Sequence, residues 1–173
     1  MTASIPILIF FRSTDRKGWH FLHVLVVEPG LRPYEKEIGD RLPDLQKEIG
    51  GMIEVVYPFQ DPVALICNEE GKLLGLPLNR ALQDENGRTY DVIAGTFLLA
   101  GLGDEDFLSL DPNLTEKYKE YFKYPERFLL SGQNILPVRV PEGCVTEDWL
   151  PDGEKRKNEI RSRIEHSRSH RER

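Results

Sequence analysis

Long apolar runs, clustered cysteines and standard catalytic motifs are all missing from this sequence of 173 residues. No run approaches the roughly 18 apolar residues that a membrane-spanning helix needs, which argues against membrane insertion. The apolar stretch from Ile5 to Phe11 ends at Arg12 without a basic leader or a small-residue cleavage site, so it is not typical of a signal peptide. Cys67 and Cys144 are too few for a disulfide framework and lack metal-type spacing. We therefore expect a cytoplasmic protein in which Cys67 is a reduced core residue.

Histidine is also scarce. Two of the four histidines, His166 and His170, are four residues apart, a spacing that would put both on one side of a helix. They lie in an arginine-rich segment with no carboxylate or cysteine in ligand spacing, so we predict no metal site. The sequence has no G-x-S-x-G, no phosphate-binding GxxxxGK motif and no Cys-His signature. It therefore predicts no cofactor, and its catalytic residues, if any exist, are unknown.

The net charge of −6 conceals an uneven distribution along the chain. Residues 154–173 contain eight Lys or Arg and four Asp or Glu, whereas residues 23–153 contain twelve basic and twenty-four acidic residues. An acidic body repels phosphate backbones, so we expect no nucleic acid to bind it, although the basic tail could contact an anion. The predicted plan is an extension over 1–22, a domain over 23–150 and a basic, disordered tail over 151–173.

Two segments have helical signals with recognisable ends. Residues 42–49 place leucine and isoleucine three and four apart, after Asp40 as an expected cap, and Gly50 begins a strong stop. Asp111 followed by proline resembles the start of a second helix, with an apolar stripe behind it. Helical signals also occur between Asp104 and Leu110.

Short β-type runs separate these helices, at residues 23–29, 52–58, 63–67, 89–102 and, more weakly, 133–141. Asn86-Gly87 is a strong turn signal, and Gly95 inside the run at 89–102 indicates a bulge or a close backbone approach. The order of elements predicts a single α+β domain. Its sheet should be mainly antiparallel, with hairpins, and its helices should pack on one face.

Six segments carry a family resemblance: "VLVVEPG", "LQKEIGG", "IEVVYPF", "ALICNEEGK", "GLPLNRAL" and "YDVIAGTFLLAGL". From about residue 23 to 140 the sequence resembles the family called domain of unknown function 3846, found in bacteria, plasmids and phages. The resemblance implies an accessory protein of mobile elements, often encoded beside antirestriction-type genes. It implies no reaction, so no catalytic residue is carried over, and residues before about 22 and after 153 do not match the family pattern.

The stretch "CNEEGK" at residues 67–72 has two interpretations. As a hairpin turn, Asn68 accepts local hydrogen bonds, Glu69 and Glu70 stay in water, Gly71 supplies a positive φ, and Lys72 leaves the turn. As a site, Asn68 at a strand end would point its amide at a ligand or a partner. Base behaviour of such residues favours the turn.

The Asn79-Arg80 pair lies in an otherwise apolar stretch and is not demanded by a turn. It would add a second amide and an always-charged donor fork to a site with Asn68. Arg80 could equally form a structural clamp with Glu69, Glu70 or Asp91. The last of these either caps the turn after Asn86-Gly87 or marks a ligand site at a strand end.

The candidate ligand-binding or partner-binding residues are therefore Asn68, Glu69, Lys72, Asn79, Arg80 and Asp91. The leading hypothesis is a non-catalytic binding module that docks on a host protein or sequesters a small ligand, in an anti-defence or antirestriction setting. In one version its carboxylates are spaced like DNA phosphates. The alternative is a small-molecule or nucleotide-binding enzyme with an Asn/Arg/Asp pocket, which requires the candidate residues to converge. A third option is a DNA-associated accessory that uses the basic tail.

Overall fold

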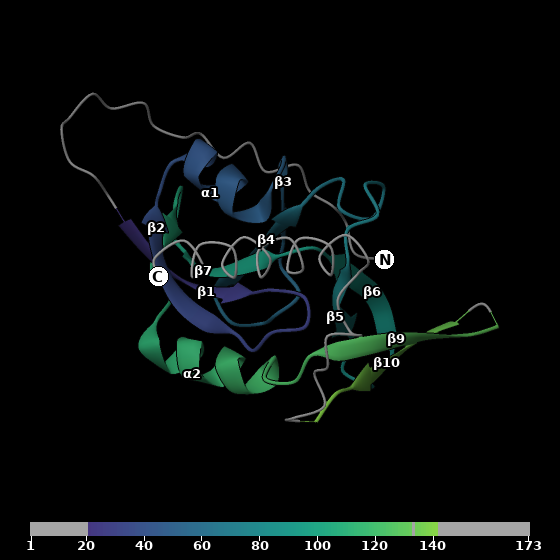
Figure 1. Ribbon diagram of the computed structural model, residues 1–173. Helices are drawn as coiled ribbons and strands as arrows, with labels where there is room; N and C mark the ends of the chain where they lie inside the picture. Colours follow the sequence, from purple (N-terminus) through teal and green to yellow (C-terminus); the bar gives the residue numbers. More distant parts are fainter. Residues whose placement is uncertain (1–20, 133, 142–173) are drawn as a thin grey trace, which may run out of the picture. The chain divides into compact units, whose positions relative to one another are not determined.

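The computed structural model describes residues 21–132 and 134–141 (Figure 1). The chain divides into two compact units, residues 1–139 and 140–173, and all the strands and helices of the described residues belong to the first. No helix in this part of the chain is long and apolar enough to cross a membrane. Residues 1–20 and 142–173 lie outside the described part, so the expectations for the extension, the domain boundary at 150 and the tail stay predictions.

The elements of the described residues are β1 (Phe21–Val27), β2 (Tyr34–Gly39), α1 (Leu42–Ile49), β3 (Ile53–Val56), β4 (Val63–Asn68), β5 (Leu78–Gln83), β6 (Thr89–Ala94), β7 (Phe97–Leu102), β8 (Phe107–Leu108), α2 (Pro112–Tyr121), β9 (Glu126–Ser131) and β10 (Asn134–Arg139). One antiparallel sheet has the order β2-β1-β7-β4-β3, with β8 paired to β7. The pairs β5–β6 and β9–β10 form two further two-stranded sheets. The mainly antiparallel α+β architecture is therefore confirmed.

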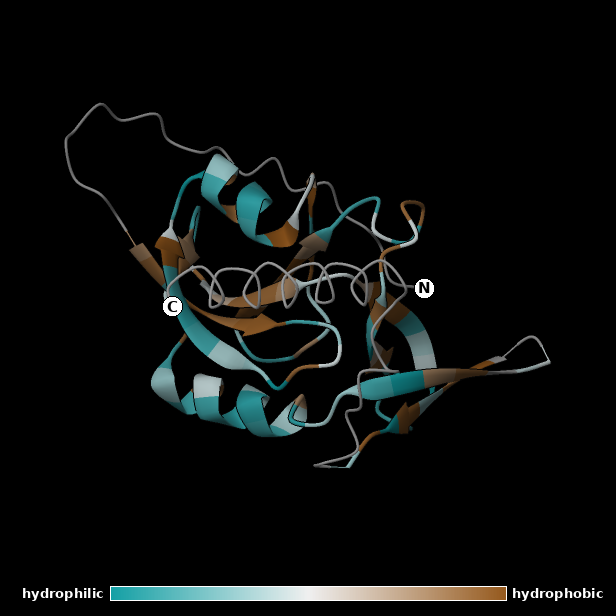
Figure 2. Ribbon diagram, in the orientation of Figure 1, coloured by the Kyte–Doolittle hydropathy of each residue, from teal (hydrophilic) through white to brown (hydrophobic). Residues whose placement is uncertain are grey.

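The two helices cover opposite faces of the main sheet, with α1 on one side and α2 on the other (Figure 1). Strand residues alternate between the faces, so Leu25 and Leu99 pack in the cluster that contains Tyr118 of α2. Val26 and Leu98 pack in the cluster that contains Leu45 of α1. The expectation that both helices share one face was wrong. A central strand that is apolar on both sides needs cover on both sides. Figure 2 shows hydrophobic central strands between two helices that are mostly hydrophilic in colour.

Local sequence accounts for the ends of both helices. Gly50 ends α1 in the left-handed conformation, at φ 73°, as predicted. The N-cap of α1 is Arg41 and not Asp40, and no side chain caps it. In α2 the predicted cap is confirmed, because the Asp111 side chain accepts a hydrogen bond of 2.8 Å from the Asn113 backbone N–H.

The apolar run at 89–102 forms two strands in different sheets. Strand β6 pairs with β5, whereas β7 pairs with β1 and β4 in the main sheet. Gly95 lies between them at φ 81°, a conformation that favours glycine, and its N–H donates to the Pro77 carbonyl at 2.7 Å. The glycine signal therefore marks a bend where the chain passes from one sheet to the other, and not a bulge within one strand.

Residues 104–110 do not form the expected helix. The Gly103 N–H donates to the Asp106 carbonyl at 2.9 Å, which closes a turn between β7 and the short strand β8. Three consecutive acidic residues favour a solvent-exposed turn because the carboxylates can spread into water.

Candidate functional site

Arg80 on β5 is buried, with 1% of its surface exposed, and backbone carbonyl groups hold it. Its Nε and Nη2 atoms donate to the Phe122 carbonyl at 3.3 and 3.0 Å, and Nη2 also donates to the Leu31 carbonyl at 2.7 Å. Nη1 donates to the backbone carbonyl of Asn79 at 3.2 Å and to its side-chain oxygen at 2.9 Å. These five contacts match the five N–H donors of a guanidinium, so none is left for a ligand.

Asn79 is fully buried, and its side-chain amide, like the Arg80 guanidinium, is engaged in hydrogen bonds within the protein. Its Nδ2 atom donates to the Val27 carbonyl at 2.9 Å and to the Gly95 carbonyl at 2.7 Å, while its Oδ1 atom accepts from Arg80. Together the two side chains tie β5 to the end of β1, to the bend before β7 and to the C-terminus of α2. A buried amide and a buried guanidinium are tolerated here because every polar group that they bury has a partner.

The alternative in which Arg80 forms a clamp with Glu69, Glu70 or Asp91 was wrong. Neutral carbonyl groups take the place of Glu69, Glu70 and Asp91. Phe122 is the C-cap of α2, where the last carbonyl groups have no partners within the helix and carry a partial negative charge. A cation with several donors fits that helix end better than a neutral side chain.

Burial lowers the pKa of Arg80 to about 10, and the negative charge of Glu126 opposes this shift. The Glu126 Oε2 atom accepts a hydrogen bond of 2.7 Å from the Ala81 backbone N–H. Burial raises the pKa of Glu126, against that hydrogen bond and the charges of Arg80 and Arg139. Arg80 therefore stays charged at neutral pH. Glu126, on β9, is the acidic side chain of this cluster.

Asn68 is also buried, at the end of β4, and serves a different part of the fold. Its Nδ2 atom donates to the Gly50 carbonyl at 3.3 Å, and its Oδ1 atom accepts from the Glu70 N–H at 2.9 Å. A side chain on Gly51 would collide with this amide, because a Cβ atom there would lie 2.4 Å from Nδ2. Asn68 thus fastens the C-terminus of α1 to the main sheet and starts the loop after β4.

The connection from β4 to β5 is not a hairpin, contrary to our prediction. Strand β4 pairs with β3 and β7, and β5 pairs with β6, so the loop carries the chain from one sheet to another. Gly71 does not have the expected positive φ, and Gly75 has it instead, at 66°. Gly71 is required for space: a Cβ atom there would lie 2.7 Å from the Ala94 carbonyl oxygen.

Lys72 and Asp91 form an ion pair between this loop and β6. Both side chains are about half exposed, so the pair contributes little to stability. Asp91 does not cap the turn after Asn86-Gly87. That role belongs to Asp84, whose Oδ1 atom accepts from the backbone N–H groups of Asn86 and Arg88, both at 2.9 Å.

Two leucines of the same loop project into solvent. Leu73 is 88% exposed and Leu74 is 59% exposed, although the loop that carries them is closely hydrogen bonded. The Leu74 N–H donates to the Glu70 carbonyl at 2.8 Å, and the Leu76 N–H donates to the Gly71 carbonyl at 2.9 Å. We call residues 69–75 the display loop. Sequence reasoning missed the two leucines because an apolar pair beside a strand usually indicates burial.

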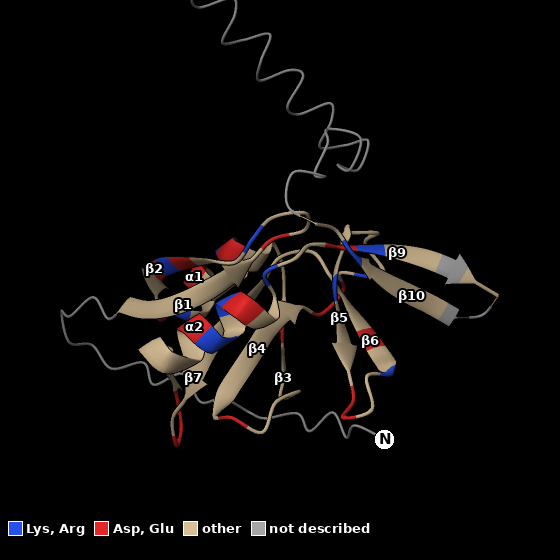
Figure 3. Cartoon of the chain, turned by 90° about the horizontal axis from the view of Figure 1, so that it is seen from below, with Lys and Arg blue, Asp and Glu red and all other residues tan. Residues whose placement is uncertain are grey.

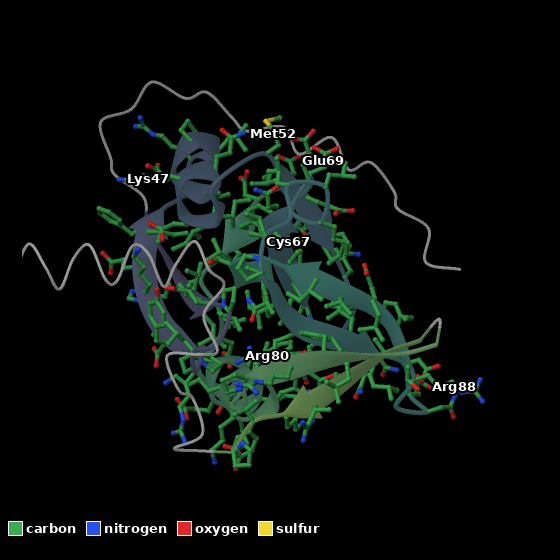
Figure 4. All side chains as sticks on the ribbon, turned by 45° about the vertical axis from the view of Figure 1, so that its right-hand side comes forward. Lys47, Met52, Cys67, Glu69, Arg80 and Arg88 are labelled. Atoms are coloured by element: carbon green, nitrogen blue, oxygen red, sulfur yellow. The ribbon has the colours of Figure 1, made fainter. Side chains whose placement is uncertain are left out.

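The six candidate residues do not converge on one site. Figure 4 shows Glu69 beside Met52 at one end of the domain and Arg80 near the other end. The hydrogen bonds agree, since Asn68 binds the end of α1 and Arg80 binds the end of α2, on opposite faces of the main sheet. Asn79 lies with Arg80 in the interior, whereas Lys72 pairs with Asp91 at the surface, on the loop that begins at Asn68 and Glu69.

An open pocket of about 340 Å³ lies at the end of β7. Its lining residues are Tyr57, Leu102, Gly103, Asp104, Glu105, Asp106 and Phe107. Burial raises the pKa of Tyr57. The lining combines apolar surface with carboxylates and offers no nucleophile paired with a base, so binding chemistry suits this pocket better than catalysis.

Acidic residues are spread over several elements and are interleaved with basic ones (Figure 3). Lysines on β2 and α2 pair with glutamates, as in the contacts of Lys36 with Glu48 and of Lys119 with Glu35 and Glu116. Carboxylates that are paired with lysines do not present the uninterrupted negative charge that mimicry of DNA phosphates would need.

Reactive and metal-binding groups are equally sparse in the described residues. No three His, Cys, Asp or Glu side chains there are placed to hold a metal ion. Cys67 is buried, and burial raises the pKa of its thiol to about 12, so it stays protonated and inert. His23 contacts the exposed Glu37 carboxylate at 3.1 Å. His166 and His170 lie outside the described residues.

Comparison with known proteins gives one result. The family model called domain of unknown function (DUF3846) matches residues 22–123, which span β1 to the end of α2. Searches of curated proteins and of solved structures found no match. The matched range includes Asn68, the display loop and the Asn79–Arg80 pair, and it ends before the β9–β10 hairpin.

Proposed function

The chain belongs to the DUF3846 family, whose description names no activity, and we propose that it is a non-catalytic binding module that docks on a partner protein. The contact surface is the display loop, with Leu73 and Leu74 as apolar anchors and Glu69, Glu70 and Lys72 around them. The setting predicted from the resemblance, a mobile-element accessory that acts on a host protein in the cytoplasm, is part of this proposal.

The state of the polar interior supports a surface function. No buried side-chain nitrogen or oxygen atom of the described residues lacks a hydrogen-bond partner. Asn68, Asn79 and Arg80 therefore act as internal fasteners, and an enzyme built on them would first have to break the fold. Of the candidate residues, Glu69, Lys72 and Asp91 have side chains at the surface, and the last two are paired with each other.

The observation that carries the proposal is the exposure of two adjacent leucines on an ordered loop. An exposed leucine by itself needs no explanation. Here the loop is fixed by the hydrogen bonds to Glu70 and Gly71 and by the αL conformation of Gly75, so the backbone that carries the two leucines keeps a defined position. A preorganised apolar anchor loses little conformational entropy on binding, which favours affinity.

The surroundings of the leucines indicate the chemistry of the partner. Two carboxylates precede them in the loop, while Lys72 is engaged by Asp91. A complementary surface would combine an apolar groove with basic residues at its rim. The acidic body of the chain would also favour the approach of such a basic partner.

Site-specific photo-crosslinking from host lysate tests the proposal. A photoreactive phenylalanine analogue replaces Leu73 in one protein and Leu108, a leucine on β8 that is 52% exposed, in the control. We expect a discrete protein adduct from position 73 and not from position 108. Native capture should fail for the Leu73→Ser/Leu74→Ser variant and succeed for Leu108→Ser. Equal capture by both variants, without an adduct at 73, would refute the display loop as the contact.

A further inference from the structure

The β9–β10 hairpin presents apolar side chains on both faces. In the register of the two strands, Leu129 lies opposite Leu136 and Phe128 lies opposite Pro137. Leu129, Leu136 and Val138 share one face, and 56%, 48% and 44% of their respective surfaces are exposed. A two-stranded hairpin is marginal by itself in water and needs further strands or packing. In Figure 1 the hairpin extends beyond β5 and β6.

The two outer edges of this hairpin differ. Pro137 has no N–H, so it occupies a position of β10 that points away from β9. The turn gives the same result. A two-residue connection closes on a hydrogen-bonded pair, here Ser131 with Asn134, and hydrogen-bonded pairs alternate with non-bonded ones along the hairpin. Pro137 and Phe128 therefore form a non-bonded pair, whose backbone groups point outward. Proline therefore blocks the outer edge of β10. Along β9, the outward N–H and C=O groups belong to residues 126, 128 and 130, and none of these is proline.

We propose that β9 pairs antiparallel with β9 of a second copy of this chain, which gives a four-stranded sheet β10-β9-β9-β10 across a two-fold axis. The outward groups lie on even-numbered residues, so two pairings overlap well, one centred on Phe128 and one on Leu129. The pairing centred on Leu129 sets this leucine beside its own copy and places Arg127 across from Ser131. The other pairing would place Arg127 across from Leu129. We therefore choose the pairing centred on Leu129.

A second copy fits this edge because the strand complements itself. Antiparallel pairing about Leu129 brings apolar side chains together and keeps the two Arg127 residues at opposite ends. Six-residue strands are only about 20 Å long, so the contact is smaller than the roughly 800 Å² per partner of a standard interface. Dimerisation should therefore depend on protein concentration in the micromolar range or above.

Sedimentation velocity of the full chain over a concentration series tests the pairing. Wild type should sediment as a monomer at low concentration and as a dimer at high concentration. Leu129→Glu and Leu129→Lys each place like charges side by side across the axis and should raise the dimer dissociation constant by about tenfold or more. An equal mixture of the two variants should restore the dimer, because the opposed charges then attract.

Circular dichroism of each variant should match wild type, since Leu129 is more than half exposed. The Leu73→Ser/Leu74→Ser variant should dimerise like wild type, which separates this pairing from the display loop. A wild type that stays a single chain at the highest concentration would overturn the proposal and leave the apolar face to another occupant. Unchanged dimerisation of Leu129→Glu, or no recovery in the mixture, would overturn it as well.

Discussion

The display loop and the Asn79–Arg80 pair lie a few residues apart in sequence and reverse the usual relation between polarity and burial. At residues 73 and 74 two leucines face water, and at 79 and 80 an amide and a guanidinium are buried. The side chains of Asn79 and Arg80 have all their hydrogen-bond partners inside the protein. The side chains of Leu73 and Leu74 are largely exposed to water and have no such partners in the interior. In this chain, residue type alone therefore does not predict which side chains are buried.

The largest loss of stability is expected at Arg80. Replacement of Arg80 with Met should lower the free energy of unfolding by about 3 to 5 kcal/mol, because the carbonyl groups of Leu31 and Phe122 lose their donors in a buried place. Chemical denaturation measures the change. Arg88, which is exposed on the turn after β5 (Figure 4), supplies the control: Arg88→Met should stay within about 0.5 kcal/mol of wild type. Equal effects of the two substitutions would contradict the clamp.

Asn79 should show the next largest effect. Asn79→Leu keeps a similar volume but removes the hydrogen bonds to the Val27 and Gly95 carbonyl groups, at a cost of about 2 to 3 kcal/mol. Because Asn79 also binds Arg80, the double variant with Arg80→Met should lose less stability than the sum of the two single changes. Strict additivity in this double-mutant cycle would show that the two residues act independently.

Glu126 should give a smaller, pH-dependent effect. Its pKa is raised in the folded protein by burial, so the folded state favours the protonated acid. Wild type should therefore lose stability relative to Glu126→Gln as pH rises above the ordinary glutamate value of 4.5. The glutamine oxygen can still accept from the Ala81 N–H. Denaturation midpoints across the acidic range measure the difference, and a difference that grows toward low pH would contradict the assigned direction.

The smallest effect on stability is expected at the display loop. The Leu73→Ser/Leu74→Ser variant replaces two side chains that are mostly exposed. Its free energy of unfolding, measured by thermal denaturation, should therefore differ from that of wild type by less than about 0.5 kcal/mol. Leu65→Ser, in the core between β4 and α2, should unfold the protein or nearly so. A loss above about 1 kcal/mol for the loop variant would make the leucines structural and remove the main support for docking.

Local signals in the sequence predicted much of the fold. The stop at Gly50, the cap at Asp111 and the turn at Asn86-Gly87 depend on neighbouring residues, and the structure contains all three. The hairpin at 67–72 and the single strand at 89–102 were wrong because the choice of partner strand is decided by residues far away in the chain. Likewise, the side of the sheet that each helix covers depends on long-range packing.

The candidate site was only partly predictable for the same reason. Arg80 stood out in the sequence as a charge in an apolar run, but its acceptors come from residues as distant as Leu31 and Phe122. A sequence does not show which carbonyl groups a fold will leave without partners. The leucines of the display loop gave no signal at all, because their exposure follows from the passage of the loop between two sheets.

The central position of β7 has a consequence for how the chain is made. The hairpins β1–β2 and β3–β4 both precede β7 in sequence, and β7 lies between them in the finished sheet. Until residues 97–102 leave the ribosome, both hairpins expose an apolar edge with open backbone hydrogen bonds. We therefore expect the nascent chain to be most prone to aggregation just before its central strand is complete.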